Sequence, residues 1–274
     1  MLSEMASMGD MRLKQIKELR DYAESLERAD SDWPTLRVFT DGGAEHMDTT
    51  RAKGYYGIVV LDPREEFRVI FEAGAACHGP TSGVSAYRSE LWGLYTAVSL
   101  LTQVIDWRGP IHVWLDNEGV VRGAEQLIGA NDTRGLKHAG RHHMQARQQG
   151  YSNREKWLWE RESGDLWESL ELQMSRTRIW QRVEVTWVGS HCDKKGDKFV
   201  PVELRTVEQK GNIESDRVCT LMRDKMARDE PLQVPRKRSW RLHLRGAEVT
   251  GKYPKVIEAE MQRNQLLMYF QNTR

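Results

Sequence analysis

Apolar residues near the start of the chain recur every three or four positions, at Leu13, Ile16, Leu19, Tyr22 and Leu26. This period predicts an amphipathic helix over residues 11–29, which the Trp-Pro pair at residues 33–34 then ends. The pattern next changes to short apolar runs separated by turn residues, at residues 36–40, 54–60 and 66–72. Three short strands in succession predict an antiparallel meander.

The helical period returns after residue 85, with apolar positions at Leu91, Leu94, Ala97, Val98 and Leu101. Glu90 is therefore expected in the first turn of a helix. Apolar runs predict two more strands at residues 110–115 and 183–188, and further helices are expected at 116–127, 165–170 and 215–226. Five strands with helices between the later ones predict an α/β fold, a five-stranded mixed sheet flanked by helices.

Two segments differ from this pattern. Residues 129–156 are polar, basic and interrupted by glycine, which predicts an exposed basic loop. After Pro231 the composition turns basic, and we expect a strand-like run at 240–244 and a helix at 255–270. The chain thus divides into an N-terminal helical extension at 1–33, an α/β domain at 34–230 and a C-terminal extension at 231–274.

Composition narrows the class of protein only slightly. The chain has 274 residues, and 41 Lys and Arg against 40 Asp and Glu leave a formal net charge of +1. Affinity for nucleic acid would then come from local basic patches. Three scattered cysteines suggest neither a disulfide framework nor a zinc module. With no secretion signal and no apolar run long enough to cross a bilayer, we expect an intracellular protein, cytoplasmic or nuclear, with no membrane partner.

Ten tryptophans are many for this length, and five gather around the last predicted helix and strand, at Trp157, Trp159, Trp167, Trp180 and Trp187. Aromatic side chains bury large areas, so packing is their commonest use. We interpret most of them as core or groove-wall residues rather than as base-stacking platforms.

Four acidic residues stand where strands end or helices begin: Asp41, Glu90, Asp116 and Asp216. Asp41 and Asp116 each follow an apolar run directly, and Asp216 is expected near the start of the closing helix. Carboxylates brought together repel one another and are tolerated chiefly when divalent cations bind between them. The pattern therefore favours a single metal-dependent site for phosphodiester chemistry.

Six short motifs occur in a fixed order: Asp41-Gly42, Arg88-Ser89-Glu90, Asp116, Asp165-Leu166-Trp167, Trp187 to His191, and Asn212 to Asp216. In this order the chain resembles the type I ribonuclease H family, especially the ribonuclease H domains of retroelement polyproteins. The likeness covers roughly residues 36–228. It implies a ribonuclease H-like catalytic domain over residues 34–230.

The resemblance also implies the chemistry. Asp41 would bridge two Mg²⁺ ions about 4 Å apart, with Glu90 and Asp116 on one ion and Asp216 on the other. Mg²⁺, for which Mn²⁺ could substitute, suits an all-carboxylate oxygen shell. His191 would assist proton transfer and product release, although the segment after it is longer than usual in the family. Hydrolysis would leave a 5′-phosphate and a 3′-hydroxyl.

By the same resemblance the substrate is an RNA–DNA hybrid, gripped across its minor groove. The implied substrate-binding residues are Gly42, Ala44, Ser85 and Asn117. A reverse transcriptase domain of the same polyprotein is the implied partner, and the protein is expected to be an endoribonuclease. Two alternatives stay open. One is a catalytically inactive ribonuclease H-like module that binds nucleic acid or a polymerase, and the other is a resolvase- or transposase-like DNA nuclease.

Overall fold

A central sheet of five strands organises the chain. The computed structural model describes residues 2–29, 32–47, 52–77, 84–131, 162–190, 194–195, 198–227, 243–244 and 247–248. The strands are β1 (Leu36–Glu45), β2 (Lys53–Leu61), β3 (Val69–Ala76), β4 (Ile111–Leu115) and β5 (Val183–Trp187). Their order is β3-β2-β1-β4-β5; β1, β2 and β3 are antiparallel neighbours, and β4 is parallel to both β1 and β5. The predicted five-stranded mixed sheet is confirmed.

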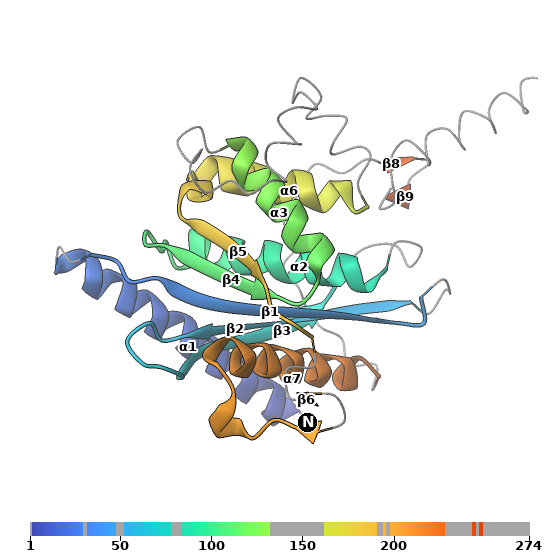
Figure 1. Cartoon of the computed structure of the whole chain (residues 1–274), viewed down its shortest axis with the longest axis horizontal. Coiled ribbons are helices and arrows are strands. Elements are labelled where there is room, and N and C mark those ends of the chain that lie inside the picture. The colour runs from blue at the N-terminus through green and yellow to red at the C-terminus, as the bar shows by residue number, and fades with distance from the viewer. Residues whose placement is uncertain are drawn as a thin grey trace, which may run out of the picture.

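Helices cover both faces of this sheet. The long helices are α1 (Leu2–Arg28), α2 (Ala86–Ser99), α3 (Glu118–Asn131), α6 (Gly164–Thr177) and α7 (Val207–Ala227). Shorter elements are η2 (Leu100–Val104), η4 (Ile179–Gln181), β6 (Lys194–Lys195), β7 (Lys198–Phe199), η5 (Val202–Leu204), β8 (His243–Leu244) and β9 (Ala247–Glu248). Figure 1 shows α2, α3 and α6 on one side of the sheet and α7 on the other. The helices that connect β3 to β4 and β4 to β5 thus lie on one face of the sheet (Figure 1).

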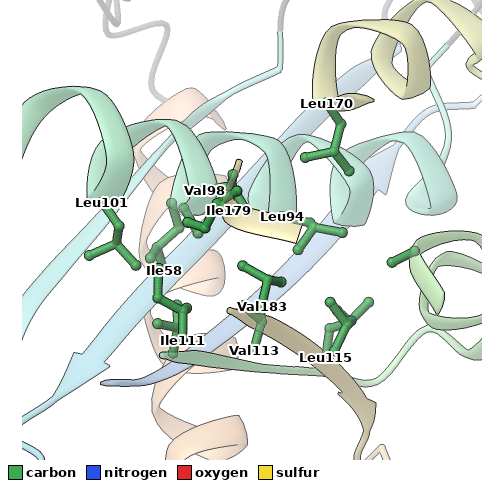
Figure 2. Close-up of a cluster of buried hydrophobic side chains, with 14 of the residues drawn as sticks. Ile58, Leu94, Val98, Leu101, Ile111, Val113, Leu115, Leu170, Ile179 and Val183 are labelled. Atoms are coloured by element: carbon green, nitrogen blue, oxygen red, sulfur yellow. The ribbon is translucent and has the colours of Figure 1, made fainter. Parts of the chain in front are cut away.

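The main core lies between the sheet and α2. Figure 2 shows it: Leu94 and Val98 of α2 and Leu101 of η2 face Ile58 of β2 and the inward residues of β4. A second cluster fills the α7 face, where Phe39 stacks on Trp114 with ring centroids 5.1 Å apart. These clusters bury both faces of the central strands, so those strands read as nearly continuous apolar runs.

Helix α1 packs against β3 and is part of the same body. Leu19 and Ala23 are buried in the main core cluster. The Arg20 guanidinium donates two hydrogen bonds, of 2.7 and 3.1 Å, to the carbonyl oxygen of Val104, near the end of η2. The N-terminal extension is therefore tied to the α/β domain by apolar burial and by hydrogen bonds. Among the described helices, none combines the length and apolar character needed to cross a bilayer.

The predicted positions of two elements are wrong. The third strand was expected at 66–72 but runs over Val69–Ala76, because residues 62–68 form a turn in which Arg64 donates three hydrogen bonds to the buried carboxylate of Asp62. The helix expected at residues 215–226 begins instead at Val207. Its start is fixed by a capping box in which the Thr206 N–H and hydroxyl bond reciprocally with Gln209.

Two smaller differences concern α2 and α3. Glu90 is the fifth residue of α2, so it opens the second turn rather than lying in the first. Residues 129–131, which were expected to start the basic loop, belong to the end of α3. The rest of that predicted loop and the predicted helix at 255–270 lie outside the described residues.

Candidate metal centre

Three of the four predicted acids meet at one end of the sheet. In the parallel pair of β1 and β4, Phe39 lies opposite Trp114, and Asp41 and Asp116 each follow that pair by two residues. Glu90 approaches from α2. One oxygen of each of Asp41, Glu90 and Asp116 lies within 4.8 Å of the other two. The fold thus brings together carboxylates that are 26 to 75 residues apart in sequence.

Glu90 is the most deeply placed of the three. Its side chain is 3% exposed, and its Oε2 atom has no hydrogen-bond donor among the described residues. Gly42 allows this approach, because a Cβ atom there would lie 2.3 Å from the Glu90 nitrogen and 2.4 Å from the Ser89 carbonyl carbon. The backbone N–H of Gly42 hydrogen-bonds to the Glu90 carboxylate. A buried carboxylate oxygen without a donor is costly unless a cation binds it.

Burial and mutual repulsion act on the same acids. Burial, followed by the charges of Asp116 and Asp216, raises the pKa of Asp41 from 3.8 to about 6. Burial, followed by the charges of Asp41 and Asp116, raises the pKa of Glu90 well above its ordinary value. No Lys or Arg appears among the main influences on either group. The cluster therefore carries negative charge that the described side chains leave uncompensated.

Asp216, the fourth predicted acid, lies in the middle of α7 and is exposed. It stands near enough to raise the pKa of Asp41, but its oxygens are not part of the group within 4.8 Å. Gly57 sets the depth of α7 at this point. It pairs with Asp41 across β1 and β2, and a Cβ atom on it would lie 2.6 Å from the Ser215 oxygen and 2.8 Å from the Cys219 nitrogen. Helix α7 therefore packs directly against the backbone of Gly57, next to Asp41.

The contact of Cys219 with the acidic cluster was not predicted from the sequence. Its thiol lies 3.9 Å from the Tyr55 carbonyl oxygen and hydrogen-bonds to the Asp41 carboxylate. Burial, followed by the charge of Asp41, raises the pKa of this thiol, so it stays protonated and can donate. The signal was available in the sequence, since residues 216 and 219 share one face of a helix. The spacing of residues 216 and 219 does not by itself show which strand α7 packs against, so it did not identify Cys219.

The predicted substrate-binding residues occupy four different places. Gly42 and Ala44 lie in β1, where they pair with Tyr56 and Gly54. Ser85 caps α2, its hydroxyl accepting from the Arg88 N–H at 3.0 Å and donating to Glu162 at 2.7 Å. The Asn117 side chain accepts from the Val120 N–H at 3.2 Å and so caps α3. All four flank the acids in sequence or space, and His191 lies outside the described residues.

A buried ion pair anchors the start of α2. The Nη1 and Nη2 atoms of Arg88 each donate to the Asp165 carboxylate at 2.7 Å, and the two side chains are 2% and 3% exposed. Beside this pair, the Trp167 indole donates to the Tyr87 hydroxyl at 3.0 Å. These contacts join α6 to the first turn of α2, two residues before Glu90. They fix the helix that carries the deepest acid.

Comparison with solved structures gives distant likenesses of fold. The ribonuclease H domain of prototype foamy virus is 16% identical, with a TM-score of 0.46, over 71% of this chain and 96% of that one. The protease–reverse transcriptase of the same virus is 16% identical, with a TM-score of 0.43, over 68% of this chain and 20% of that one.

A third likeness is to a ribonuclease H1 from the archaeon Halobacterium salinarum, which is 13% identical, with a TM-score of 0.38, over 70% of this chain and 98% of that one. No protein-family model and no curated protein sequence matches the chain. The chain's own sheet order and helix placement establish a five-stranded mixed sheet flanked by helices.

Proposed function

We propose that this chain is a metal-dependent endonuclease that cuts the RNA strand of RNA–DNA hybrids. The observation that carries the proposal is the meeting of Asp41, Glu90 and Asp116 within 4.8 Å at one end of the sheet. Structural acids at a protein surface are normally solvated or paired with a base. Here one of the three is buried with an oxygen that has no donor among the described residues.

The donor set suits Mg²⁺. All candidate ligands are carboxylate oxygens, which hard divalent cations prefer, and Mn²⁺ accepts the same set. Asp41, Glu90 and Asp116 would hold one ion. Asp41 also interacts with Asp216, so these two acids would hold a second. Cys219 would remain a donor to Asp41 rather than a ligand, since its pKa is raised by burial.

Divalent ions bound here would supply charge stabilisation and an acidified water for phosphodiester hydrolysis. The chain's own residues have separate tasks. The buried position of Glu90 excludes water from one side of the cluster, and the Cys219 thiol and the Gly42 amide orient Asp41 and Glu90 by hydrogen bonds. His191 would assist proton transfer and product release. Ser85, Ala44, Gly42 and Asn117 would contact the hybrid.

The proposed setting is an intracellular retroelement polyprotein, with the catalytic domain at 34–230 between extensions at 1–33 and 231–274. A reverse transcriptase domain would be its partner and would supply the hybrid. The anchoring of α1 on β3 supports the idea that the first extension travels with the catalytic domain.

Cleavage assays with labelled substrates test the proposal. We expect the purified chain to cut an RNA–DNA hybrid when Mg²⁺ or Mn²⁺ is added and not in EDTA, leaving 5′-phosphates. Double-stranded RNA and single-stranded DNA should stay intact. Asp41→Asn and Asp116→Asn should abolish cutting while the protein stays folded by circular dichroism.

Other results would replace the proposal. Binding of the hybrid with no cleavage under any divalent ion would indicate an inactive nucleic-acid-binding or polymerase-binding module. Cleavage of DNA duplexes or junctions would indicate a resolvase- or transposase-like nuclease. Cleavage of the hybrid by Asp41→Asn at the parental rate would remove the site assignment.

A further inference from the structure

Trp187 differs from every other tryptophan that the structure describes. Its side chain is 52% exposed, whereas the described Trp33, Trp92, Trp107, Trp114, Trp167 and Trp180 are buried or half-buried. Indole rings contribute most to stability when they are buried, so half-exposure of so large an apolar surface is unfavourable in the free protein. Packing in the core therefore explains the other described tryptophans and leaves this one unexplained.

The ring is held beside the acidic cluster. Trp187 is the last residue of β5 and pairs with Leu115, the last residue of β4. Its indole Nε1 donates to the carbonyl oxygen of Asp116 at 3.1 Å. The Val188 N–H donates to the carbonyl oxygen of Leu115 at 3.0 Å and continues the ladder past the strand end. The indole is thus fixed against the backbone of a residue whose carboxylate belongs to the candidate metal centre.

That hydrogen bond also determines which part of the ring meets solvent. The Nε1–H is the indole's only polar group, and Asp116 takes it. What stays exposed is an apolar π surface on a side chain whose rotation the hydrogen bond restricts. Within a duplex the bases stack on one another, so a flat apolar face of this kind can pack on the sugar edges of a minor groove, largely without regard to sequence.

We propose that the exposed face of Trp187 is a platform for a nucleotide of the bound hybrid, next to the position that is cut. This inference rests on the proposed function and adds a substrate contact to it. The platform would hold the strand by packing on a sugar ring, while the neighbouring carboxylates hold the ions. It would position substrate without taking part in the chemical step.

Binding and cleavage by the full chain test the platform. Anisotropy of an end-labelled RNA–DNA hybrid, measured in EDTA so that no strand is cut, should show Trp187→Ala binding about 5-fold more weakly than the parent, the effect of losing about 1 kcal/mol of contact. Trp187→Phe keeps a ring but loses the hydrogen bond to Asp116, and should bind nearly as tightly as the parent.

Phe67→Ala is the matched control. Phe67 is an exposed aromatic residue, 37% exposed, in the turn between β2 and β3. That turn follows Leu61, which pairs with Arg37 at the opposite end of β1 from the acids. Its loss should leave both binding and cleavage unchanged. Circular dichroism and Mg²⁺ titration of each variant check that the fold and the metal affinity are kept.

The outcomes separate the two proposals. If the parent binds and cuts the hybrid but Trp187→Ala binds it equally well, the platform is wrong and the nuclease stands. If Trp187→Phe is as weak as Trp187→Ala and has also lost Mg²⁺ affinity, the residue acts by positioning Asp116 and the platform is again wrong. If the parent neither binds nor cuts the hybrid, the proposed function fails and the platform with it.

Discussion

Two groups of buried charge lie two residues apart on α2, and they are arranged in opposite ways. Arg88 meets Asp165 through two hydrogen bonds of 2.7 Å, so each buried charge has its counter-charge. Glu90 meets Asp41 and Asp116, so negative charge is added to negative charge. The first arrangement holds α2 to α6, whereas the second opposes folding until a cation arrives. The contrast indicates that Arg88 has a structural role and Glu90 a functional one.

The largest effect on stability is expected from disrupting the Arg88–Asp165 ion pair. Arg88→Met should lower the free energy of unfolding by about 3–5 kcal/mol, because it leaves the Asp165 carboxylate buried without a partner. Urea denaturation followed by circular dichroism measures this change. The double variant Arg88→Met with Asp165→Leu should regain most of the loss, since it removes both charges. A single variant that loses under 1 kcal/mol would contradict the structural role.

The acidic cluster should show the opposite behaviour as pH changes. The pKa of Asp41 is raised from 3.8 to about 6 in the folded protein, so the folded state holds more protons than the unfolded state between those values. The free energy of unfolding of the metal-free protein should therefore fall as pH rises from about 4 to about 6, by about 2 kcal/mol from Asp41 alone. Glu90, whose pKa is also raised, extends the fall to higher pH.

Comparison of the parent with Asp41→Asn isolates this effect. The variant cannot ionise at residue 41, so its stability should fall less over the same range and should exceed that of the parent above about pH 6. Asp62 interferes little with this measurement, because hydrogen bonds from Arg64 lower its pKa. Its contribution to stability therefore changes at more acid pH. Saturating Mg²⁺ should flatten the curve of the parent alone. If the curves of unfolding free energy against pH run parallel for the parent and Asp41→Asn in EDTA, ionisation of Asp41 does not lower the stability of the folded protein.

These two regions also show what the sequence could reveal. Asp41 and Asp116 were predictable because each directly follows an apolar run, and the two runs pair in parallel. Strand β1 itself continues past Asp41 to Glu45, which was not predicted. Arg88 and Asp165 stood in recognised motifs, yet their pairing was not foreseen. They are 77 residues apart, and nothing in local periodicity says that the start of α6 lies against the start of α2. Local signals thus located the acids and left the tertiary ion pair hidden.

The start of α7 was missed for a different reason. Gly211 lies inside α7, and a Cβ atom there would lie 2.4 Å from two carbons of the Phe39 ring. The glycine is there for close packing on β1 rather than for a turn. Because the helix starts at Val207, Asp216 lies in its middle, over the sheet. Helix propensity could not reveal this, since the deciding contact is with a strand about 170 residues earlier in the chain.

Gly57 offers the finest test, because it acts on the α7 side of the cluster, where Asp216 and Cys219 lie. Gly57→Ala adds a methyl group against the backbone of Ser215 and Cys219, which must move away. We expect α7 to lift from β2 at a cost of about 1–3 kcal/mol in unfolding free energy. Asp216 would then move away from Asp41, while the group of Asp41, Glu90 and Asp116 stays intact.

Gly57→Ala should therefore bind Mg²⁺ at fewer or weaker sites. It should keep the Arg88–Asp165 ion pair and the contribution that this pair makes to stability. Gly189→Ala is the control, because the nearest atom to its new methyl group, in the Trp187 ring, is 3.9 Å away and is an ordinary contact. Isothermal titration of both variants with Mg²⁺ makes the measurement. If Gly57→Ala is destabilised as expected but binds Mg²⁺ like the parent, Asp216 contributes nothing to the metal centre. The functional group of acids would then be the three that the sheet and α2 bring together.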